Sequence, residues 1–292
     1  MTGNKFNFIG ILAFILVLLS MPIGHAAMIL MEYFLSGSAL NIAAFLLGLA
    51  GIAIMIAGMH VKKDTASTLL GFIGGLLTWT GWIEFCYVYF AKKLSISPLI
   101  ENGVVVTKPE YLLMMSSIGF WSIIMLLYIF KMRTGCKMFL WIQRKVGIMP
   151  EMRKEATSNN KSLTTFIETN IIIWSCYILL MFLYDKSILG DRHPITIIIA
   201  IGSLVWSLWL FKNLIKIKLM GYAIRYALPT VIIFWNFVEV IGRIGIMEEI
   251  WINPLKYKVE MLIILIAAIG LILFITFSKI NKKINFSKKE LK

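Results

Sequence analysis

The sequence is poor in charge, and acidic residues are the scarcer kind. Only 15% of its 292 residues are charged, 29 basic residues stand against 15 acidic ones, and 59% of the chain is hydrophobic. The mean hydropathy is +0.84. A soluble domain of this length needs far more polar surface to cover its core, so the composition predicts a chain solvated largely by lipid.

Cysteine and the motifs of several enzyme classes are also lacking. Cys86, Cys136 and Cys176 form no CxxC pair and have no metal-ligand spacing, which argues against a disulfide framework and against zinc. No Walker A loop, HExxH or GxSxG is present, which disfavours ATP hydrolysis, zinc proteolysis and α/β-hydrolase chemistry. The three histidines are too far apart for stacked haems. The net charge of +14 is not gathered on one basic face, so we expect no nucleic-acid partner.

Eight long apolar runs are present instead. Crossing about 30 Å of hydrocarbon takes roughly 20 residues in a helix. The sequence therefore predicts an all-α integral membrane protein with eight transmembrane helices. We expect them at about 6–32, 38–60, 67–91, 111–131, 163–185, 194–216, 219–243 and 258–279.

The first of these runs can also be interpreted as a signal peptide. Lys5 precedes the apolar stretch, and Pro22 followed by Gly24 and Ala26 resembles a small-x-small cleavage site, so that residues 1–26 would be removed. The apolar run continues through residues 28–31 instead of stopping, which favours a retained helix.

The distribution of basic residues predicts the orientation. If the amino terminus is cytoplasmic, 21 of the 29 Lys and Arg residues fall in inner segments and 8 fall in outer loops. This bias agrees with the positive-inside rule. We therefore expect a multi-pass protein of the cell membrane with both termini in the cytoplasm. The loops near residues 36, 100, 189 and 252 would then be external.

A long basic loop at 132–162 divides the chain into two four-helix units, 1–131 and 163–279, and a basic cytoplasmic tail follows at 280–292. Apolar residues recur at helical spacing within the loop. They fit either a short amphipathic helix on the anionic lipids of the inner leaflet or an ordinary connector. These residues are Phe139, Ile142, Val146 and Met149.

The two units resemble each other in sequence. The third helix carries WIEF at 82–85 and the seventh carries FVEV at 237–240, while KPEYL opens the fourth helix and KVEML opens the eighth. Four helices per unit is an even number, so both copies would enter the membrane in the same direction, with a symmetry axis along the membrane normal. The alternative is that apolar sequence of low complexity aligns easily with itself.

Glu84 is the strongest functional candidate. A carboxylate within a transmembrane helix is costly unless it is paired, protonated or hydrated. Glu84 lies about eight residues, or about 12 Å, from the expected outer end of its helix, and Val88 rather than a cation stands one turn on. Either another helix supplies a partner, such as His25, or the acid is protonated because desolvation disfavours its charged form. A purely structural, hydrogen-bonded acid is the alternative.

Glu239 lies at a similar depth in the seventh helix, but Arg243 follows it four residues later on the same face. We therefore expect an i,i+4 ion pair between them, with a structural role.

Many of the remaining polar residues are expected in the outer half of the membrane, around a polar pocket that opens to the outer face. Asp191 and Pro194 are expected to begin the sixth helix as its cap and first turn. Met21, His25 and Met28 share one stripe whose sulfur and imidazole atoms would suit copper, but methionine is a common core filler and we assign no metal. The other pocket candidates are Glu32, Asn236, Trp82, Trp235, Arg192 and His193.

Three functions fit these features. The first is a transporter or a proton- or cation-coupled ion pathway that uses Glu84. The second is a membrane subunit of a larger respiratory complex, with a pocket for quinone, lipid or a metal. In its four-plus-four helix count the chain is similar to the polysulfide-reductase-type quinol-interacting membrane subunits, although it lacks their motifs. The third is a lipid-modifying enzyme whose outer acids act on a headgroup with Arg192 and His193. The scarcity of polar residues in the inner half weighs against a complete transport path, whereas the short loops weigh for partner subunits.

Overall fold

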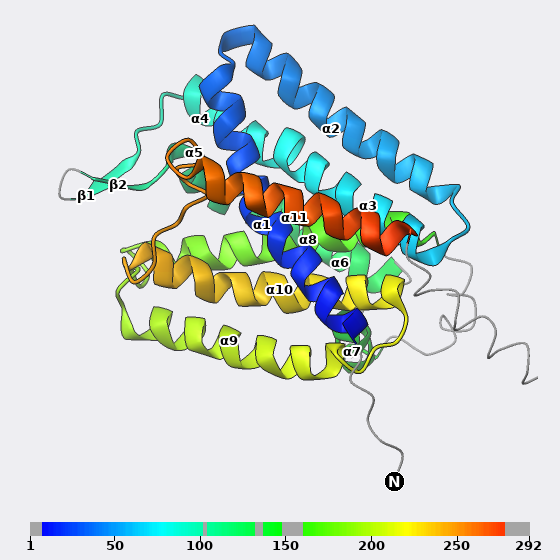
Figure 1. The fold of residues 1–292 in the computed structure, drawn as a ribbon. Helices are drawn as coiled ribbons and strands as arrows, with labels where there is room; N and C mark the ends of the chain where they lie inside the picture. Colours follow the sequence, from blue (N-terminus) through cyan, green and yellow to red (C-terminus); the bar gives the residue numbers. More distant parts are fainter. Residues whose placement is uncertain (1–7, 102–103, 132–136, 148–159, 278–292) are drawn as a thin grey trace, which may run out of the picture.

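Eight long helices dominate the fold of the described residues, and Figure 1 shows them packed into one bundle. The computed structural model describes residues 8–101, 104–131, 137–147 and 160–277. The eight helices are long and apolar enough to cross a membrane, and their ends lie within three residues of those predicted. They are α1 (Phe8–Phe34), α2 (Gly37–Met59), a composite span (Asp64–Lys93), a second composite span (Pro109–Lys131), α8 (Lys161–Tyr184), α9 (Pro194–Leu214), α10 (Met220–Arg243) and α11 (Lys258–Phe277).

The first composite span changes helix type along its length. It begins as α3 (Asp64–Thr78), passes through a π-helix, η1 (Trp79–Glu84), and ends as α4 (Phe85–Lys93). The π-helix inserts one residue per turn relative to an α-helix, and such segments occur frequently at functional sites. The sequence did not predict η1, which ends on Glu84.

The second composite span consists of α5 (Pro109–Met114), a short 3-10 helix, η2 (Met115–Ser117), and α6 (Ile118–Lys131). An antiparallel hairpin of β1 (Leu99–Glu101) and β2 (Val104–Thr107) precedes it, where the sequence analysis predicted only an external loop.

The basic central loop contains a short helix, α7 (Lys137–Lys145). Of the apolar positions that predicted a helix there, Met149 lies outside the described residues. The predicted tail at 280–292 and the segment 1–7 also lie outside them.

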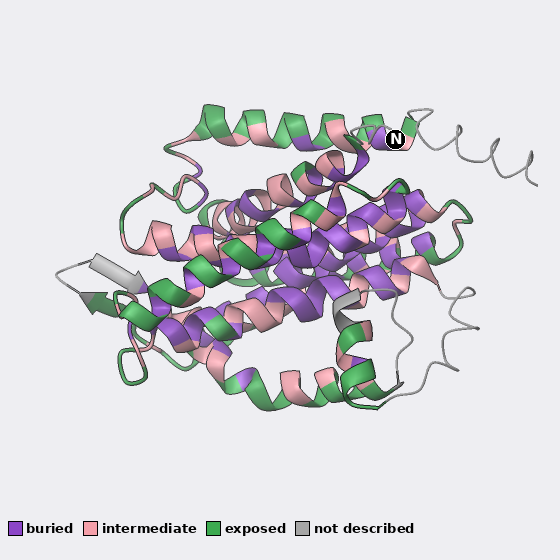
Figure 2. Cartoon of the chain, turned by 90° about the horizontal axis from the view of Figure 1, so that it is seen from below, coloured by how far each residue is buried: buried purple, intermediate pink, exposed green. Residues whose placement is uncertain are grey.

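α10 forms the centre of the bundle. It packs against α1, α3, α8 and α9. Of its most apolar stretch 78% is buried, compared with 28% for α2 and 22% for α9, which lie on opposite sides of the bundle (Figure 1). Figure 2 shows the same layering, with buried residues gathered on the inner helices and exposed ones on the outer helices.

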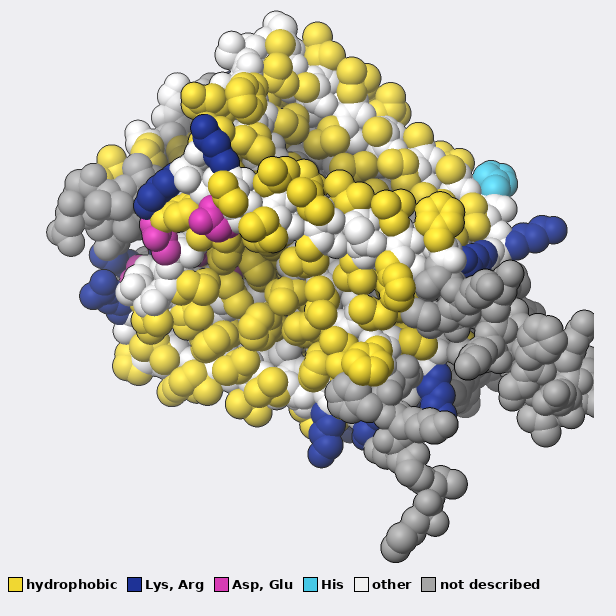
Figure 3. Space-filling view, viewed as in Figure 1, with side chains coloured by type: hydrophobic (Ala, Val, Ile, Leu, Met, Phe, Trp, Pro, Cys, Tyr) yellow, Lys and Arg dark blue, Asp and Glu magenta, His cyan; other side chains and the backbone are white. Residues whose placement is uncertain are grey.

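The flanks of the bundle are apolar and its two ends are charged. Large hydrophobic side chains such as Phe45, Phe120, Trp209 and Ile266 are exposed on the outer helices. In Figure 3 hydrophobic side chains cover the visible flank, while Lys, Arg, Asp and Glu gather toward the ends. Monomeric soluble proteins rarely expose so large an apolar surface. The chain is therefore a multi-pass membrane protein of almost entirely helical fold.

The two ends of the bundle differ in structure. One end, here the hairpin end, carries β1, β2 and the loops at 185–193 and 244–257. The other, the α7 end, carries α7 and the short connections at 60–63 and 215–219.

Glycine allows α2 and η1 to approach closely. A Cβ atom added to Gly81 would lie 2.5 Å from the backbone nitrogen of Gly48, and one added to Gly48 would overlap the indole ring of Trp82. No larger side chain fits at these contacts unless the backbone moves. The π-helical turn is thus held against α2, and this contact fixes the position of Glu84 at its end.

Candidate functional site

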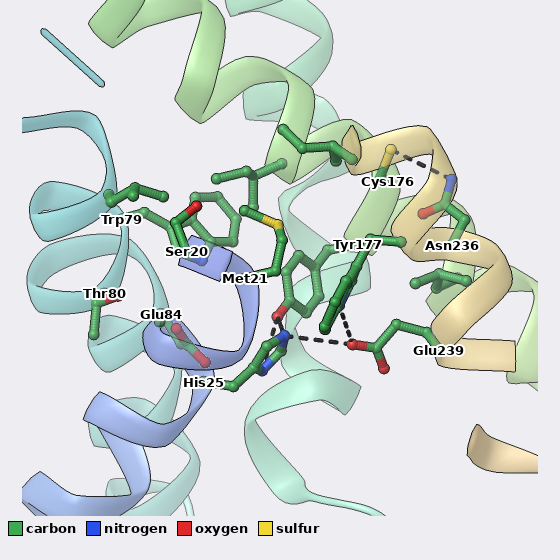
Figure 4. A pocket seen from close by; sticks show the side chains of 16 residues that line it. Ser20, Met21, His25, Trp79, Thr80, Glu84, Cys176, Tyr177, Asn236 and Glu239 are labelled. Atoms are coloured by element: carbon green, nitrogen blue, oxygen red, sulfur yellow. Dashed lines mark hydrogen bonds and ion pairs between the residues drawn. The ribbon is translucent and has the colours of Figure 1, made fainter. Parts of the chain in front are cut away.

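A small cavity, lined mainly by apolar surface with a few polar side chains, lies between α1, η1, α8 and α10, nearer the hairpin end of these helices. Its volume is about 50 Å³, which is room for roughly three or four water molecules. His25, Glu84, Tyr177 and Glu239 line it, one from each of these four elements (Figure 4).

His25 is the residue through which the cavity side chains are connected. Its Nε2 lies 3.4 Å from Oε1 of Glu239 and 3.0 Å from the hydroxyl oxygen of Tyr177. Glu239 also accepts a hydrogen bond of 2.7 Å from the indole N–H of Trp235, one turn earlier on α10. The imidazole is therefore held between α8 and α10 by polar contacts.

Glu84 faces the same cavity from the other side of His25 (Figure 4). The residue is only 5% exposed. Among the described residues, none donates a hydrogen bond to its carboxylate or forms an ion pair with it. A buried charge without a partner is expensive in a membrane, so the cavity must provide water, a proton or another ligand for this group.

Stacked aromatic rings form two walls of the cavity. His25 stacks on Trp235 with ring centroids 6.3 Å apart, and Tyr177 stacks on Trp79 at 5.5 Å. Tyr111 of α5 stacks on the same tyrosine at 6.0 Å. These rings place rigid apolar surface beside the polar groups of the cavity.

The predicted ion pair between Glu239 and Arg243 is not formed. The Nε atom of Arg243 instead lies 3.5 Å from Oδ2 of Asp191, and its Nη2 donates a hydrogen bond of 2.6 Å to Thr107. The guanidinium also lies over the ring of Tyr184, 4.7 Å from its centroid. Spacing along α10 permitted the predicted pair, but residues brought in by the hairpin and by the 185–193 loop offered better partners.

Several predicted pocket residues lie elsewhere. Glu32 forms an ion pair of 2.9 Å with Lys92 at the surface. Trp82 points away from the cavity toward α2, where its indole donates to the carbonyl of Phe45 at 3.0 Å. Arg192 is exposed in the 185–193 loop. Trp235 and Asn236 do line the cavity with His25, Glu84 and Glu239.

His193, rather than Asp191, caps α9. Its Nδ1 accepts a hydrogen bond of 3.2 Å from the backbone N–H of Ile195. Asp191 is engaged with Arg243 instead. Met28 of the proposed copper stripe is buried in a hydrophobic cluster with Leu40 and Phe85, so the stripe does not converge on one point.

The loop at 244–257 covers the hairpin-end side of the cavity. Trp251 is 6% exposed and packs against Trp235 with ring centroids 4.7 Å apart. Glu249 lies against Gly242, where an added Cβ would be 2.5 Å from its Oε1. Burial raises the pKa of Glu249 to about 7, and the nearby Glu239 carboxylate acts in the same direction, whereas His25 and Arg243 oppose it.

The α7 end of the bundle is more polar inside than the sequence analysis expected. Glu168 is fully buried on α8 and accepts a hydrogen bond of 2.6 Å from Tyr128. Arg225 of α10 contacts Asp64 of α3 at 3.3 Å and donates a hydrogen bond to Thr68. Tertiary packing thus gathers, at this end of the bundle, polar side chains that are scattered along the chain.

Sequence reasoning missed Tyr177 as a cavity residue. It is an aromatic residue within an apolar helix, where the ordinary role is core packing, and only its tertiary contacts distinguish it. Comparisons with family models, with curated proteins and with solved structures found no match for the chain.

Proposed function

We propose that the protein moves protons across the cell membrane, alone or coupled to another ion, and that Glu84 takes up and releases the proton. The observation that carries this proposal is Glu84 itself. It is a buried carboxylate without a hydrogen-bond or ion-pair partner among the described residues, and it faces a cavity of water-molecule size next to a histidine. Ionisable residues within membrane spans commonly mark ion or proton pathways.

The size and lining of the cavity favour a proton over a larger ligand. Pockets for drug-sized molecules have volumes of roughly 300–1,000 Å³, whereas this cavity has about 50 Å³. A quinone ring or a lipid headgroup would need a substantial opening of the helices. Carboxylate, imidazole and phenol side chains can each exchange a proton with water, and the cavity contains all three kinds.

Proton transfer across the cavity needs no covalent chemistry. For inward movement, a proton passes from the imidazolium form of His25 through cavity water to the Glu84 carboxylate, which leaves a neutral imidazole and a carboxylic acid. Glu239, 3.4 Å from Nε2, stabilises the imidazolium. The Tyr177 hydroxyl, 3.0 Å from the same nitrogen, orients the ring.

We also infer that the two four-helix units are parallel copies related by an axis along the membrane normal. In support, α3 packs on α8 as α10 packs on α1, and α2 packs on α3 as α9 packs on α10. The stacking of Tyr177 on Trp79 has its counterpart in that of His25 on Trp235.

The π-helix explains the difference in spacing between the two units. Trp235 precedes Glu239 by four residues, whereas Trp79 precedes Glu84 by five. A π-helical turn pairs residue i with i+5, so the extra residue is absorbed within η1 and Glu84 stays in register with Glu239. On this interpretation one histidine serves two equivalent carboxylates, and in this structure it is paired with Glu239.

The charge bias of the sequence supports an orientation with the hairpin end outside and the α7 end in the cytoplasm. In this orientation α7, which carries Arg144 and Lys145 in its last turn, meets the anionic lipids of the inner leaflet.

Proton movement in proteoliposomes tests the proposal. A pH-sensitive dye is trapped inside, and proton entry is driven by a potassium diffusion potential set with valinomycin. Glu84→Gln keeps the shape of the side chain but cannot titrate, so we expect proton entry to fall by about a hundredfold. Glu32→Gln is the matched control, because Glu32 pairs with Lys92 at the surface. Equal proton entry in wild type and Glu84→Gln would rule out the assigned role.

A further inference from the structure

The loop at 244–257 contains two neighbouring acids in very different environments. Glu248 is exposed and forms an ion pair of 2.7 Å with Lys256, and hydrogen bonds from Lys256 and Tyr257 lower its pKa. Glu249 is only partly exposed, and its carboxylate has no hydrogen-bond or ion-pair partner within the part of the chain that the structure describes. One of the two therefore has a clear structural role on the surface, and the other has none.

Glu249 of the loop packs against the face of α10 that carries Glu239. Its carboxylate packs against Gly242, where an added Cβ would lie 2.5 Å from Oε1. Gly242 follows Glu239 by three residues, and residues three apart are neighbours on a helix surface, with about 5–6 Å between their Cβ positions. The absence of a side chain at Gly242 gives the carboxylate this position, one turn nearer the hairpin end than Glu239.

The residues next to Glu249 make contacts of their own and form no ion pair with its carboxylate. Trp251 of the same loop covers Trp235. Arg243, the next residue on α10, is held by Asp191 and Thr107. The charged and titratable groups that act on Glu249 are Glu239 and Arg243 from α10 and His25 from α1.

We propose that Glu249 is the residue through which the cavity exchanges protons with the aqueous phase at the hairpin end. This inference rests on the proposed function of Glu84. External water protonates the Glu249 carboxylate, and the carboxylic acid then gives the proton, through water, to the Glu239–His25 pair. The carboxylate that remains is protonated again from outside, so each cycle moves one proton inward and leaves Glu249 unchanged.

The protonation behaviour of Glu249 suits this role. Because its pKa is about 7, the group holds a proton in part of the population near neutral pH and can both accept and donate one there. An ordinary surface glutamate is almost fully ionised at that pH.

Proton entry into proteoliposomes, measured as for Glu84, tests the assignment. We expect Glu249→Gln to slow proton entry from the hairpin-end side by about tenfold, since bulk water must then reach the cavity unaided. In Glu248→Gln, one residue away, protons should enter at the wild-type rate. Gly242→Ala, which displaces the Glu249 carboxylate without removing it, should also slow entry.

Rescue by a small weak acid separates a relay from a structural role. After subtraction of the acidification that formate causes in protein-free liposomes, external formate should restore entry in Glu249→Gln, because it carries a proton to the same place, but not in Glu84→Gln, which lacks the internal acceptor. Wild-type rates in Glu249→Gln, or a slow rate that formate does not restore, would overturn the assignment and leave the role of Glu84 intact. If Glu84→Gln itself equals wild type, the proposed function fails, and the relay fails with it.

Discussion

Replacement of Arg243 by methionine tests which acid this partly buried cation holds. Sequence spacing pairs Arg243 with Glu239, whereas the structure pairs it with Asp191 at 3.5 Å. The two partners have side-chain exposures of only 18% and 17%, so the pair is largely screened from water. Removal of one member of a buried pair costs about 3–5 kcal/mol, because the other charge stays buried alone.

The magnitude expected here lies at the lower end of that range. The separation of 3.5 Å is long for a charge-assisted hydrogen bond, and the remaining accessibility lets water solvate an orphaned Asp191. Loss of the contact with the Tyr184 ring adds a cation–π term of about 0.5–1 kcal/mol. We therefore expect Arg243→Met to lower the free energy of unfolding by about 3.5 kcal/mol.

The assay is reversible unfolding of purified protein in mixed micelles, followed by circular dichroism. Asp191→Asn combined with Arg243→Met removes both charges, so it should recover at least half of the lost stability. Glu239→Gln combined with Arg243→Met should recover none, because Glu239 is held by His25 and Trp235. Recovery of stability by Glu239→Gln and not by Asp191→Asn would refute the Arg243–Asp191 pair. It would favour instead the Arg243–Glu239 pair predicted from helical spacing.

Three further predictions follow from packing, protonation and topology. Gly81→Ala should cost about 1–3 kcal/mol of unfolding free energy through overpacking against α2, whereas Gly270→Ala, with nothing within 4 Å of its added Cβ, should be neutral or slightly stabilising in the same unfolding assay. The pKa of Glu249 is raised to about 7, so its contribution to stability is present below its unfolded pKa and is lost as pH rises through about 7. The protection factor of amides in the 244–257 loop, which is the intrinsic exchange rate at each pH divided by the observed rate, should therefore fall across that pH range in wild type and stay constant in Glu249→Gln. In a variant without native cysteines, a cysteine at Asn253 should react with an impermeant thiol reagent in intact cells and one at Asn159 should not, the reverse pattern being incompatible with the proposed orientation.

The helices of this protein could be predicted closely from the sequence because a membrane imposes a length and an apolar composition on each span. Pro109 and Pro194 stand at the first turns of their helices, as helix-start preferences predict. The hairpin was missed, although the Asn-Gly pair at 102–103 between two β-prone runs is the strongest short-range signal for one. The expectation of a helical membrane protein masked that signal.

The candidate site could be predicted only in part. Glu84 and His25 were identified because a buried charge within an apolar run is conspicuous in any sequence. The partners were not, because they depend on which helices meet: Tyr177 reaches His25 from 152 positions away, and Arg243 finds Asp191 in a loop. The π-helix at Trp79–Glu84 was also missed, since it differs from an α-helix by a single inserted residue.

Infrared difference spectroscopy of Glu84 tests the central claim most directly. Spectra of purified wild type and Glu84→Gln are recorded over a pH series in H₂O and in D₂O, and the variant is subtracted. If Glu84 exchanges a proton with cavity water, the difference contains a carboxylic-acid C=O band that changes with pH and shifts in D₂O. A carboxylate signal that is constant at every pH, or an acid band that D₂O leaves unmoved, would contradict the claim that this residue takes up and releases a proton.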